Sequence, residues 1–342
     1  MSSTSQVTTY ADLKLDLSNR VRVTTGITAT ETQIGRYINI ALQDIHLGFD
    51  YKLPWAERRG FIRTHAPYTT GTVSISVGST ALTGSSTLWN TANSYNENNA
   101  RTTGKIRLNS GVDIYNITTV GSDTSITLTQ RYVGSAALSA EDYIYFEDEY
   151  ALASDFLRLV DLQSFSDVAA IPLIGRGEWR RRYPRPNIAG RPRVATILDK
   201  SFSGNTTPVR MVQFYPYPND VYMIPYDYIS NVVAVSSAGV EATALSSDTD
   251  EPTMPLRYRH AIVLHALYHW YRDKKDDARA DAAKGEYTDI MMRITSDQEI
   301  GTHVQAQIQP RMGMYTRHAY RPYSNRGGRR IDINGEFDRF QR

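Results

Sequence analysis

Near the start of the chain, apolar residues recur at the spacing of a helix. The first series follows Thr9, which stands three residues before Asp12, and comprises Leu13, Leu17 and Val21. A threonine and an acidic residue in this relation are typical of a capping box at a helix start. A second series with steps of three and four residues comprises Ile34, Ile38, Ala41, Ile45 and Phe49. We therefore expect two helices, and the short turn between them predicts antiparallel packing.

Between residues 70 and 146 the period changes to two. Apolar and polar positions alternate in several short runs, for example at Val73, Ile75 and Val77. Turns rich in Gly, Ser and Asp separate these runs, and this arrangement predicts a small antiparallel β-barrel or sandwich. The segment fits either a rigid module that acts as a spacer or a surface decoration, or a module that itself binds sugar or protein.

Residues 147–250 mix both patterns. The stretch FLRLVDLQSF fits either a short strand or a helix. Residues 209–235 carry aromatic and β-branched residues on both sides of PYPND, which predicts a hairpin with PYPND as its turn. From Pro255 onward the helical period returns, first in Leu256, Val263, Leu267 and Trp270. It continues in Ala283, Tyr287, Ile290 and Ile294.

Helical segments thus bracket the β segments. We expect an α+β protein in which both chain ends form a helical bundle, with a central β-hairpin region. The predicted helical core with its central β region covers residues 1–69 and 147–301. The inserted β-barrel or sandwich module covers residues 70–146. An extended Arg/Tyr-rich C-terminal tail covers residues 302–342, and it is predicted to be unstructured in the free chain because it lacks periodicity.

Composition removes several classes of function. The 342 residues include no Cys, which excludes a disulfide scaffold, a thiol nucleophile and every thiolate zinc site. No run of apolar residues is long enough to span a membrane, and the first residues lack the pattern of a signal peptide. The net charge of +2 provides no overall field that would hold nucleic acid.

The search for catalytic chemistry gives little. His265 and His269 have the spacing of two zinc ligands, but the Glu of HExxH is missing and no carboxylate occupies a convincing third position. We expect packed or interface histidines, with no metal and no cofactor. The pairs Asp148/Glu149 and Asp276/Asp277 are predicted to be solvated. Phosphate-binding loops and nucleophile elbows are absent from the sequence, so the chain is predicted not to be an enzyme.

Two segments rich in Arg and aromatic residues give the strongest local signal. In residues 176–193, prolines at 184, 186 and 192 predict an extended arm. Its arginines fit contacts with carboxylates on another subunit, contacts with nucleic acid, or a solvated loop. In the tail, Met and aromatic residues predict folding coupled to binding. The candidate partner-binding residues are Arg176, Trp179, Arg180, Arg181, Arg182, Tyr183, Arg185, Met312, Tyr315, Tyr320, Arg321, Tyr323, Arg329, Arg330 and Phe337.

The order of the segments resembles that of the head-to-tail adaptor (connector) proteins of tailed bacteriophages. TYADLKLDLSNRVRV and ITATETQIGRYINIALQDIH look like the opening helix pair of that family. PRVATILDKSFSGNTTPVRMVQFYPYPNDVYMIPYDY is similar to its central β hairpin, and YRHAIVLHALYHWYRDKKDDARADAAKGEYTDIMMRI resembles its closing helices. TGTVSISVGSTALTGSSTLW looks like a β motif that recurs in phage structural proteins.

The resemblance implies a structural virion protein of the head-to-tail interface, or neck, assembled in the host cytoplasm. It implies a homo-oligomeric ring of about twelve copies beneath the portal protein, held by side-to-side contacts. The chain ends would reach the portal, and the far side would dock a tail nozzle, tube or fibre protein. Viral DNA would pass through the lumen without sequence-specific binding. The alternatives are a tail receptor- or glycan-binding protein that uses residues 70–146, and a nucleic-acid-binding protein that uses residues 176–193.

Overall fold

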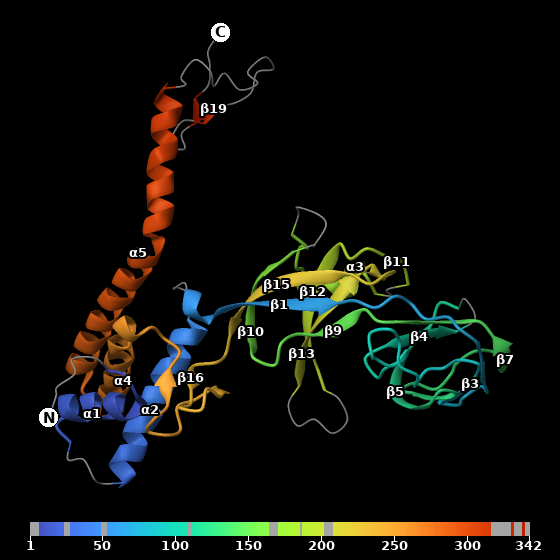
Figure 1. Ribbon diagram of the computed structural model, residues 1–342, viewed down its shortest axis with the longest axis horizontal. Helices are drawn as coiled ribbons and strands as arrows, with labels where there is room; N and C mark the ends of the chain where they lie inside the picture. The colour runs from blue at the N-terminus through green and yellow to red at the C-terminus, as the bar shows by residue number, and fades with distance from the viewer. Residues whose placement is uncertain are drawn as a thin grey trace. The chain divides into compact units, whose positions relative to one another are not determined.

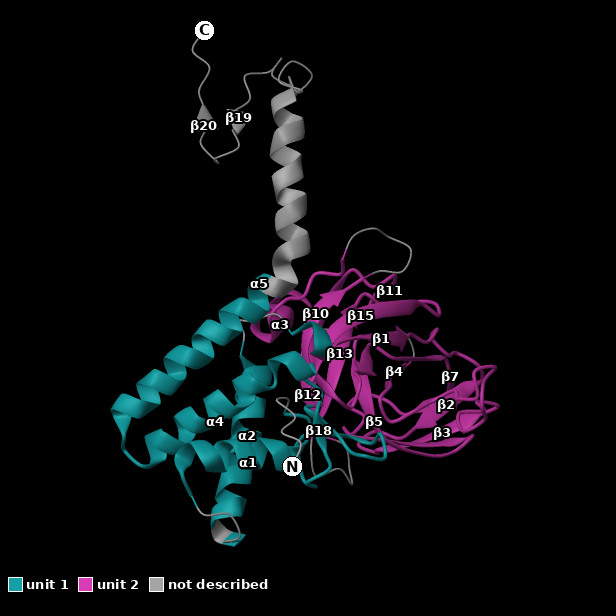
Figure 2. Ribbon diagram, turned by 60° about the vertical axis from the view of Figure 1, so that its left-hand side comes forward, with its two compact units in different colours: residues 1–55, 233–342 teal, residues 56–232 magenta. Residues whose placement is uncertain are grey.

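The computed structural model is a mixed α/β protein (Figure 1). It describes residues 7–23, 28–48, 53–108, 111–163, 170–184, 187–201, 208–315, 330–331 and 337–338. Side chains are described up to residue 296, apart from residue 29. The chain divides into two compact units, of which unit 1 comprises residues 1–55 and 233–342 and unit 2 comprises residues 56–232 (Figure 2).

Unit 1 contains the helices near both ends of the chain. They are α1 (Tyr10–Val21), α2 (Thr28–Leu47), the short helix η2 (Leu256–Tyr258), α4 (His260–Asp273) and α5 (Asp277–Tyr315). Helix α1 begins with the predicted capping box, in which the Thr9 side chain accepts from the Asp12 N–H and the Asp12 side chain accepts from the Thr9 N–H. The first N–H groups at a helix start have no acceptor within the helix, and the capping box supplies acceptors for two backbone N–H groups here.

The helices of unit 1 pack through the predicted apolar stripes. Helix α4 contacts α1, α2 and α5, and α1 contacts α2. The buried residues include Leu13 and Leu17 from α1 and Ile34, Ile38, Ala41 and Ile45 from α2. Phe49, the last predicted member of the second stripe, lies outside the described residues. Burial of these faces, rather than intrinsic propensity, supplies most of the stability of such helices.

A small sheet completes unit 1. It is formed by β16 (Ala234–Val235), β17 (Glu241–Ala242) and β18 (Glu251–Pro252), in the order β17-β16-β18. The connection between β17 and β18 supplies a partner for α1, because the N–H of Tyr10 donates to the carbonyl of Asp250 at 2.8 Å. Arg259, which is 7% exposed, donates to the carbonyls of Met254 and Pro252 at 3.0 and 2.9 Å. These bonds join the sheet to the start of α1 and of α4.

Helix α5 continues beyond the predicted end of the helical region. The sequence predicted an unstructured tail from Thr302, whereas α5 extends to Tyr315, so this boundary was wrong. Val304 and Ile308 are four residues apart, the spacing of one helical face, and the alanine and glutamines among residues 302–309 also favour a helix. Beyond α5, β19 (Arg330–Ile331) pairs antiparallel with β20 (Phe337–Asp338). The remaining tail residues, 316–329, 332–336 and 339–342, lie outside the described part of the chain.

Two three-stranded antiparallel sheets form the body of unit 2. The first has the order β1-β15-β10, with bounds Glu57–Arg63, Met223–Ser230 and Phe156–Leu162. The second has the order β12-β13-β9, with bounds Val194–Lys200, Val209–Tyr215 and Glu149–Ala151. Residues of both sheets share one apolar core, which includes Ile62, Tyr150, Phe214 and Tyr226. The stretch FLRLVDLQSF, left open by the sequence, thus contains a strand.

The predicted hairpin over residues 209–235 was wrong. Its two arms are the strands β13 and β15, but β13 pairs with β12 and β9, whereas β15 pairs with β1 and β10. Pro216 and Pro218 lie between the arms and cannot donate to a continuing ladder. Instead β14 (Tyr217–Pro218) pairs in parallel with β11 (Ala189–Gly190). The antiparallel pair in this region lies one strand earlier, between β12 and β13.

The predicted β module is a single curled seven-stranded antiparallel sheet (Figure 1). Its order is β7-β2-β3-β6-β5-β4-β8, with bounds Leu138–Glu141, Thr72–Ile75, Ala81–Ser85, Ser125–Leu128, Ile114–Ser122, Lys105–Leu108 and Tyr143–Phe146. The two edge strands, β7 and β8, are consecutive in the chain with only Asp142 between them. The sheet must therefore curl back toward its own first edge. Trp89, fully buried in its core, donates to the Tyr143 hydroxyl at 3.0 Å.

Unit 2 contains this module together with residues 56–69 and 147–232. The division into three domains stays a prediction. Within the part of the chain that the structure describes, no helix has both the length and the apolar character needed to cross a membrane.

Candidate interaction surfaces

The arginine-rich segment is anchored by one buried tryptophan. Helix α3 (Arg176–Arg182) places Trp179 inward, where it is 4% exposed. The Trp179 ring packs edge-on against Tyr183 and Tyr215, with ring centroids 5.4 and 6.4 Å apart. Tyr183 and Tyr215 stack at 4.1 Å. Because Tyr215 belongs to β13, these three rings fix the short helix to the body of unit 2.

The same helix displays a row of charged side chains. Arg176, Arg180, Arg181 and Arg182 are exposed, and we call these four residues the α3 basic surface. Arg182 forms an ion pair with Glu178 one turn earlier, at 2.7 Å. A planar guanidinium makes two-pronged contacts with carboxylates, and arginine is enriched in protein interfaces. The surface therefore has the chemistry of a protein contact, held on a rigid support.

The predicted extended arm was wrong for residues 176–182, which are helical. The prolines at 184, 186 and 192 all come after the helix, so they do not restrict residues 176–182 to an extended conformation. Tyr183, which precedes Pro184, is the residue at which the helix stops. Trp179 and Tyr183, predicted to touch a partner, pack within unit 2, while Arg185 lies outside the described residues. The binding role of this segment stays a prediction.

The predicted residues of the tail are only partly described. Met312 and Tyr315 lie in the last turns of α5. Arg330 and Phe337 lie in β19 and β20, where Arg330 pairs with Asp338 and Ile331 pairs with Phe337 in the ladder. Tyr320, Arg321, Tyr323 and Arg329 fall outside the described residues. Their role in binding a partner also stays a prediction.

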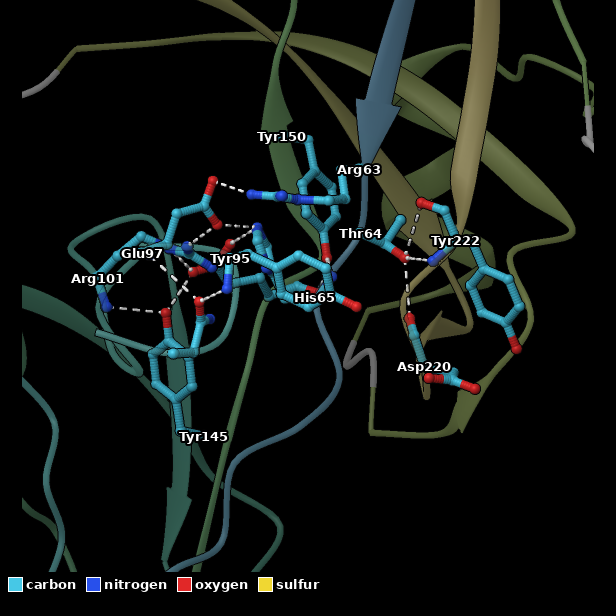
Figure 3. Close-up of polar contacts among 12 residues, drawn as sticks. Arg63, Thr64, His65, Tyr95, Glu97, Arg101, Tyr145, Tyr150, Asp220 and Tyr222 are labelled. Atoms are coloured by element: carbon cyan, nitrogen blue, oxygen red, sulfur yellow. Dashed lines mark hydrogen bonds and ion pairs between the residues drawn. The ribbon is translucent and has the colours of Figure 1, made fainter. Parts of the chain in front are cut away.

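A polar network attaches the curled sheet to the body of unit 2 (Figure 3). Arg101, from the connection between β3 and β4, contacts Glu147 at 2.8 Å and Glu97 at 2.6 Å. Arg63, from the end of β1, forms an ion pair with Glu97, and His65 lies 3.3 Å from the same carboxylate. Burial lowers the pKa of His65 even though Glu147 and Glu97 favour its charged form. His65 is therefore neutral near pH 7, and the arginines carry the positive charge of the network.

A second, more deeply buried cluster crosses the same junction. Lys105 of β4 is 8% exposed and lies 2.7 Å from both Asp148 and Glu149. Glu149 also pairs with Lys200 at 2.7 Å, and Gln213 donates to Asp148 at 2.7 Å. Burial disfavours the ammonium, but the two carboxylates hold the pKa of Lys105 above its ordinary value. The prediction that Asp148 and Glu149 are solvated was wrong, because both are buried and paired with Lys105, and Glu149 is paired with Lys200 as well.

The other acidic pair behaves as predicted. Asp277 is exposed, and Asp276 is half-buried and accepts from the backbone N–H of Arg279. Sequence reasoning missed Lys105 as the partner of Asp148 and Glu149 because it lies more than forty positions away. The signal that was present is the single lysine of residues 70–146, a segment that carries few charges.

The aromatic residues of the curled sheet mostly serve its own core. Trp89, Tyr115 and Tyr132 are 0%, 5% and 9% exposed, whereas Tyr95 is 47% exposed and lies beneath the Arg63 guanidinium. Ligand sites are lined largely by accessible apolar and aromatic side chains. Trp89, Tyr115 and Tyr132 are occupied inside the module and are not available to a glycan.

His265 and His269 on α4 are packed, as the sequence predicted. His265 stacks on Tyr287 with ring centroids 4.3 Å apart and meets His269 edge-on at 4.7 Å. Burial, and then the neighbouring His269, lowers the pKa of His265 to about 4, so the ring is neutral at pH 7. The sequence showed no carboxylate that could be a third ligand beside the two histidines, but α2 supplies one, because Asp44 lies 2.9 Å from His269.

Comparison with known families gives one match. The family model described as "SU10 adaptor protein" matches residues 8–311, which includes most of both compact units. A comparison with curated proteins finds no match. The matched range covers the opening helices, the curled sheet, helix α3 and most of α5. The chain therefore belongs to the SU10 adaptor family, a family of structural bacteriophage proteins that connect head and tail components at the neck of the virion.

Proposed function

We propose that this protein forms a homo-oligomeric ring of about twelve copies that attaches beneath the portal protein. The ring extends the DNA channel toward the tail and docks a tail nozzle, tube or fibre protein on its far side. Viral DNA slides through the lumen without sequence-specific contacts. The ring assembles in the host cytoplasm and does no chemistry of its own.

The observation that carries this proposal is the adaptor-family match over residues 8–311. Its extent matters, because a match confined to one module would leave the rest of the chain free to have another role. Adaptor activity also requires several separate binding surfaces on one chain, and α3 and the tail offer two segments of suitable composition. We assign α3 to the contact between neighbouring copies and the tail to the contact with the portal.

The α3 basic surface is proposed as one half of the contact between neighbouring copies. A ring needs a heterologous contact, in which one patch meets a different patch on the next copy. Four exposed arginines on a helix anchored by Trp179 suit that geometry. Because the helix is already fixed, binding loses less conformational entropy than it would on a flexible loop. The complementary patch would be acidic.

The helical unit and the tail are proposed to face the portal. In this arrangement the helices of both chain ends form a closed bundle, and α5 carries the tail toward the portal surface. The Met and aromatic residues beyond Arg311 then fold onto that surface when they bind it. Keeping this step dependent on the portal prevents premature assembly of rings in the cytoplasm.

The proposal is tested with purified portal rings. The isolated chain is expected to be largely monomeric in analytical ultracentrifugation and to be retained by portal rings in a pull-down. Deleting residues 316–342, which leaves α5 intact, is expected to abolish retention without changing helix content by circular dichroism. Full retention after this deletion would show that the tail does not bind the portal.

The alternative of a receptor- or glycan-binding protein has less support, because Trp89, Tyr115 and Tyr132 are buried. It predicts that the full chain binds host cells or polysaccharide through residues 70–146. The nucleic-acid alternative predicts DNA affinity that falls steeply with salt, whereas a sliding conduit predicts weak binding with a shallow salt dependence.

A further inference from the structure

Three potential metal ligands converge between two helices of unit 1. Asp44 comes from α2, and His265 and His269 are one turn apart on α4, a helix that contacts α2. Asp44 Oδ2 lies 2.9 Å from His269 Nε2 and 3.4 Å from His265 Nε2. One potential ligand atom from each side chain lies within 4.8 Å of the other two. Residues 221 and 225 positions apart in the sequence thus present their ligand atoms to one small volume.

The polar atoms of this group are incompletely satisfied. His269 Nε2 is buried and, although near Asp44, makes no well-aligned hydrogen bond with any described residue. His265 Nδ1 is also buried without a hydrogen-bond partner in the described part of the chain. Buried polar atoms usually have partners, and an exception calls for an explanation such as an ion. A cation between the carboxylate and the imidazoles would supply the missing interaction of His269 Nε2.

We propose that Asp44, His265 and His269 form a Zn²⁺-binding site that clamps helix α2 to helix α4. Imidazole and carboxylate are established zinc ligands, with bonds of about 2.0–2.2 Å. Tetrahedral bonds of that length place neighbouring ligand atoms roughly 3.3–3.5 Å apart. The His265–Asp44 distance already meets this requirement, and the His269–Asp44 distance requires only a small opening.

The surroundings decide how the ion would be held. Zinc binds the neutral form of imidazole, and burial keeps His265 in that form at neutral pH. The His265 ring is held between helices by its stacking on Tyr287 of α5. The Asp44 side chain is 43% exposed, so the fourth position of the ion opens toward solvent on that side. A site with three protein ligands and one open position results.

One nearby charge works against a cation. Lys284 of α5 disfavours the charged form of His265, so its ammonium also repels a metal ion at this place. Removing that charge is therefore expected to strengthen zinc binding, whereas removing Asp44 weakens it. The two opposite effects separate a real site from nonspecific binding to histidines.

The test uses the untagged full chain, stripped of metal with a chelator and dialysed against Zn²⁺. We expect one Zn²⁺ per chain and a higher melting temperature with zinc. When Co²⁺ replaces Zn²⁺, we expect the visible absorption typical of four-coordinate cobalt. His265→Asn/His269→Asn is expected to abolish these signals. Asp44→Asn is expected to weaken zinc binding at least about tenfold, since even changes outside the ligand shell have effects of this size.

Two variants serve as matched controls. His260→Asn removes an exposed histidine from the start of the same helix and should leave zinc binding unchanged. Lys284→Gln should bind zinc at least as tightly as the unaltered chain. Less than one Zn²⁺ per unaltered chain, or full binding by Asp44→Asn, would overturn the proposal. If the double variant fails to fold, Asp44→Asn decides alone, because its partly exposed side chain can be replaced without loss of packing.

Discussion

At the scale of single residues, buried charges hold unit 2 together. Lys105, Asp148 and Glu149 are almost inaccessible to water, and each depends on the others for compensation. Such groups often add little stability compared with apolar residues of the same size, but the loss of one partner strands the rest. This asymmetry makes Lys105 the most sensitive position of the junction.

Replacing Lys105 with Met should destabilise unit 2 by about 3–5 kcal/mol, because the buried Asp148 carboxylate loses its cation and Glu149 keeps only Lys200. Urea unfolding followed by tryptophan fluorescence measures this change. Lys14→Met is the matched control, since Lys14 pairs with the exposed Asp248 and should change stability by less than about 1 kcal/mol. Equal effects for the two variants would contradict the assigned role of Lys105.

Asp155 gives the pH dependence of the same unit. It accepts from Ser230 and Tyr228 at 2.7 and 2.9 Å and pairs with Arg58 at 3.0 Å. Burial raises its pKa, but these partners outweigh burial and leave the pKa below its ordinary value. A carboxyl group with a lowered folded-state pKa stabilises the fold above its unfolded pKa, near 4, and loses that contribution as the pH falls further.

Asp155→Asn should therefore lower stability at pH 7 by about 1–3 kcal/mol and weaken the dependence of stability on pH below about pH 4. Denaturant unfolding at a series of pH values tests both parts. Unchanged acid sensitivity in the variant would assign that sensitivity to other carboxylates.

At the scale of elements, the sequence predicted what depends on neighbours in the chain. The capping box of α1 was predictable because Thr9 and Asp12 are three residues apart. The strands β13 and β15 were predictable as strands, but their partners were not, because alternation is equally compatible with any neighbour. Asp44 was missed for the same reason: its proximity to His269 exists only once α2 and α4 pack.

Helix α3 shows the limit of arguing from prolines. The arginines before Pro184 are good helix formers, and burial of Trp179 favours the helix, whereas the prolines restrict only the chain from Tyr183 onward. The sequence therefore identified the basic segment correctly and its conformation incorrectly. The exposed side of the helix, not an extended strand of chain, is the surface that a partner would meet.

Replacing Arg176, Arg180 and Arg181 together with Gln should leave the melting temperature nearly unchanged, because all three are exposed. The same variant should lose ring formation on the portal if α3 contacts the neighbouring copy. Arg131→Gln, at an exposed arginine of the curled sheet, is the matched control and should assemble normally. Normal assembly of the triple variant would show that the contact between neighbouring copies does not depend on α3.

At the scale of the whole molecule, the curled sheet lies within unit 2, and charged side chains connect it to residues 147–149. Replacing residues 70–144 with a short Gly/Ser linker removes Arg101 and Lys105 and leaves three buried carboxylates without them. The shortened chain should therefore be less stable than the full chain. Adding Glu147→Gln and Asp148→Asn should restore part of that stability, as measured by urea unfolding. A shortened chain as stable as the original would mean that the junction contributes nothing.

Attachment of the chain to the portal as a ring can be observed by electron microscopy of purified portal rings mixed with the full chain. We expect an added ring of density on one side only of each portal, with rotational symmetry and a central opening wide enough for duplex DNA. Portal rings that stay unchanged in the presence of excess protein would show that the chain does not attach in this way.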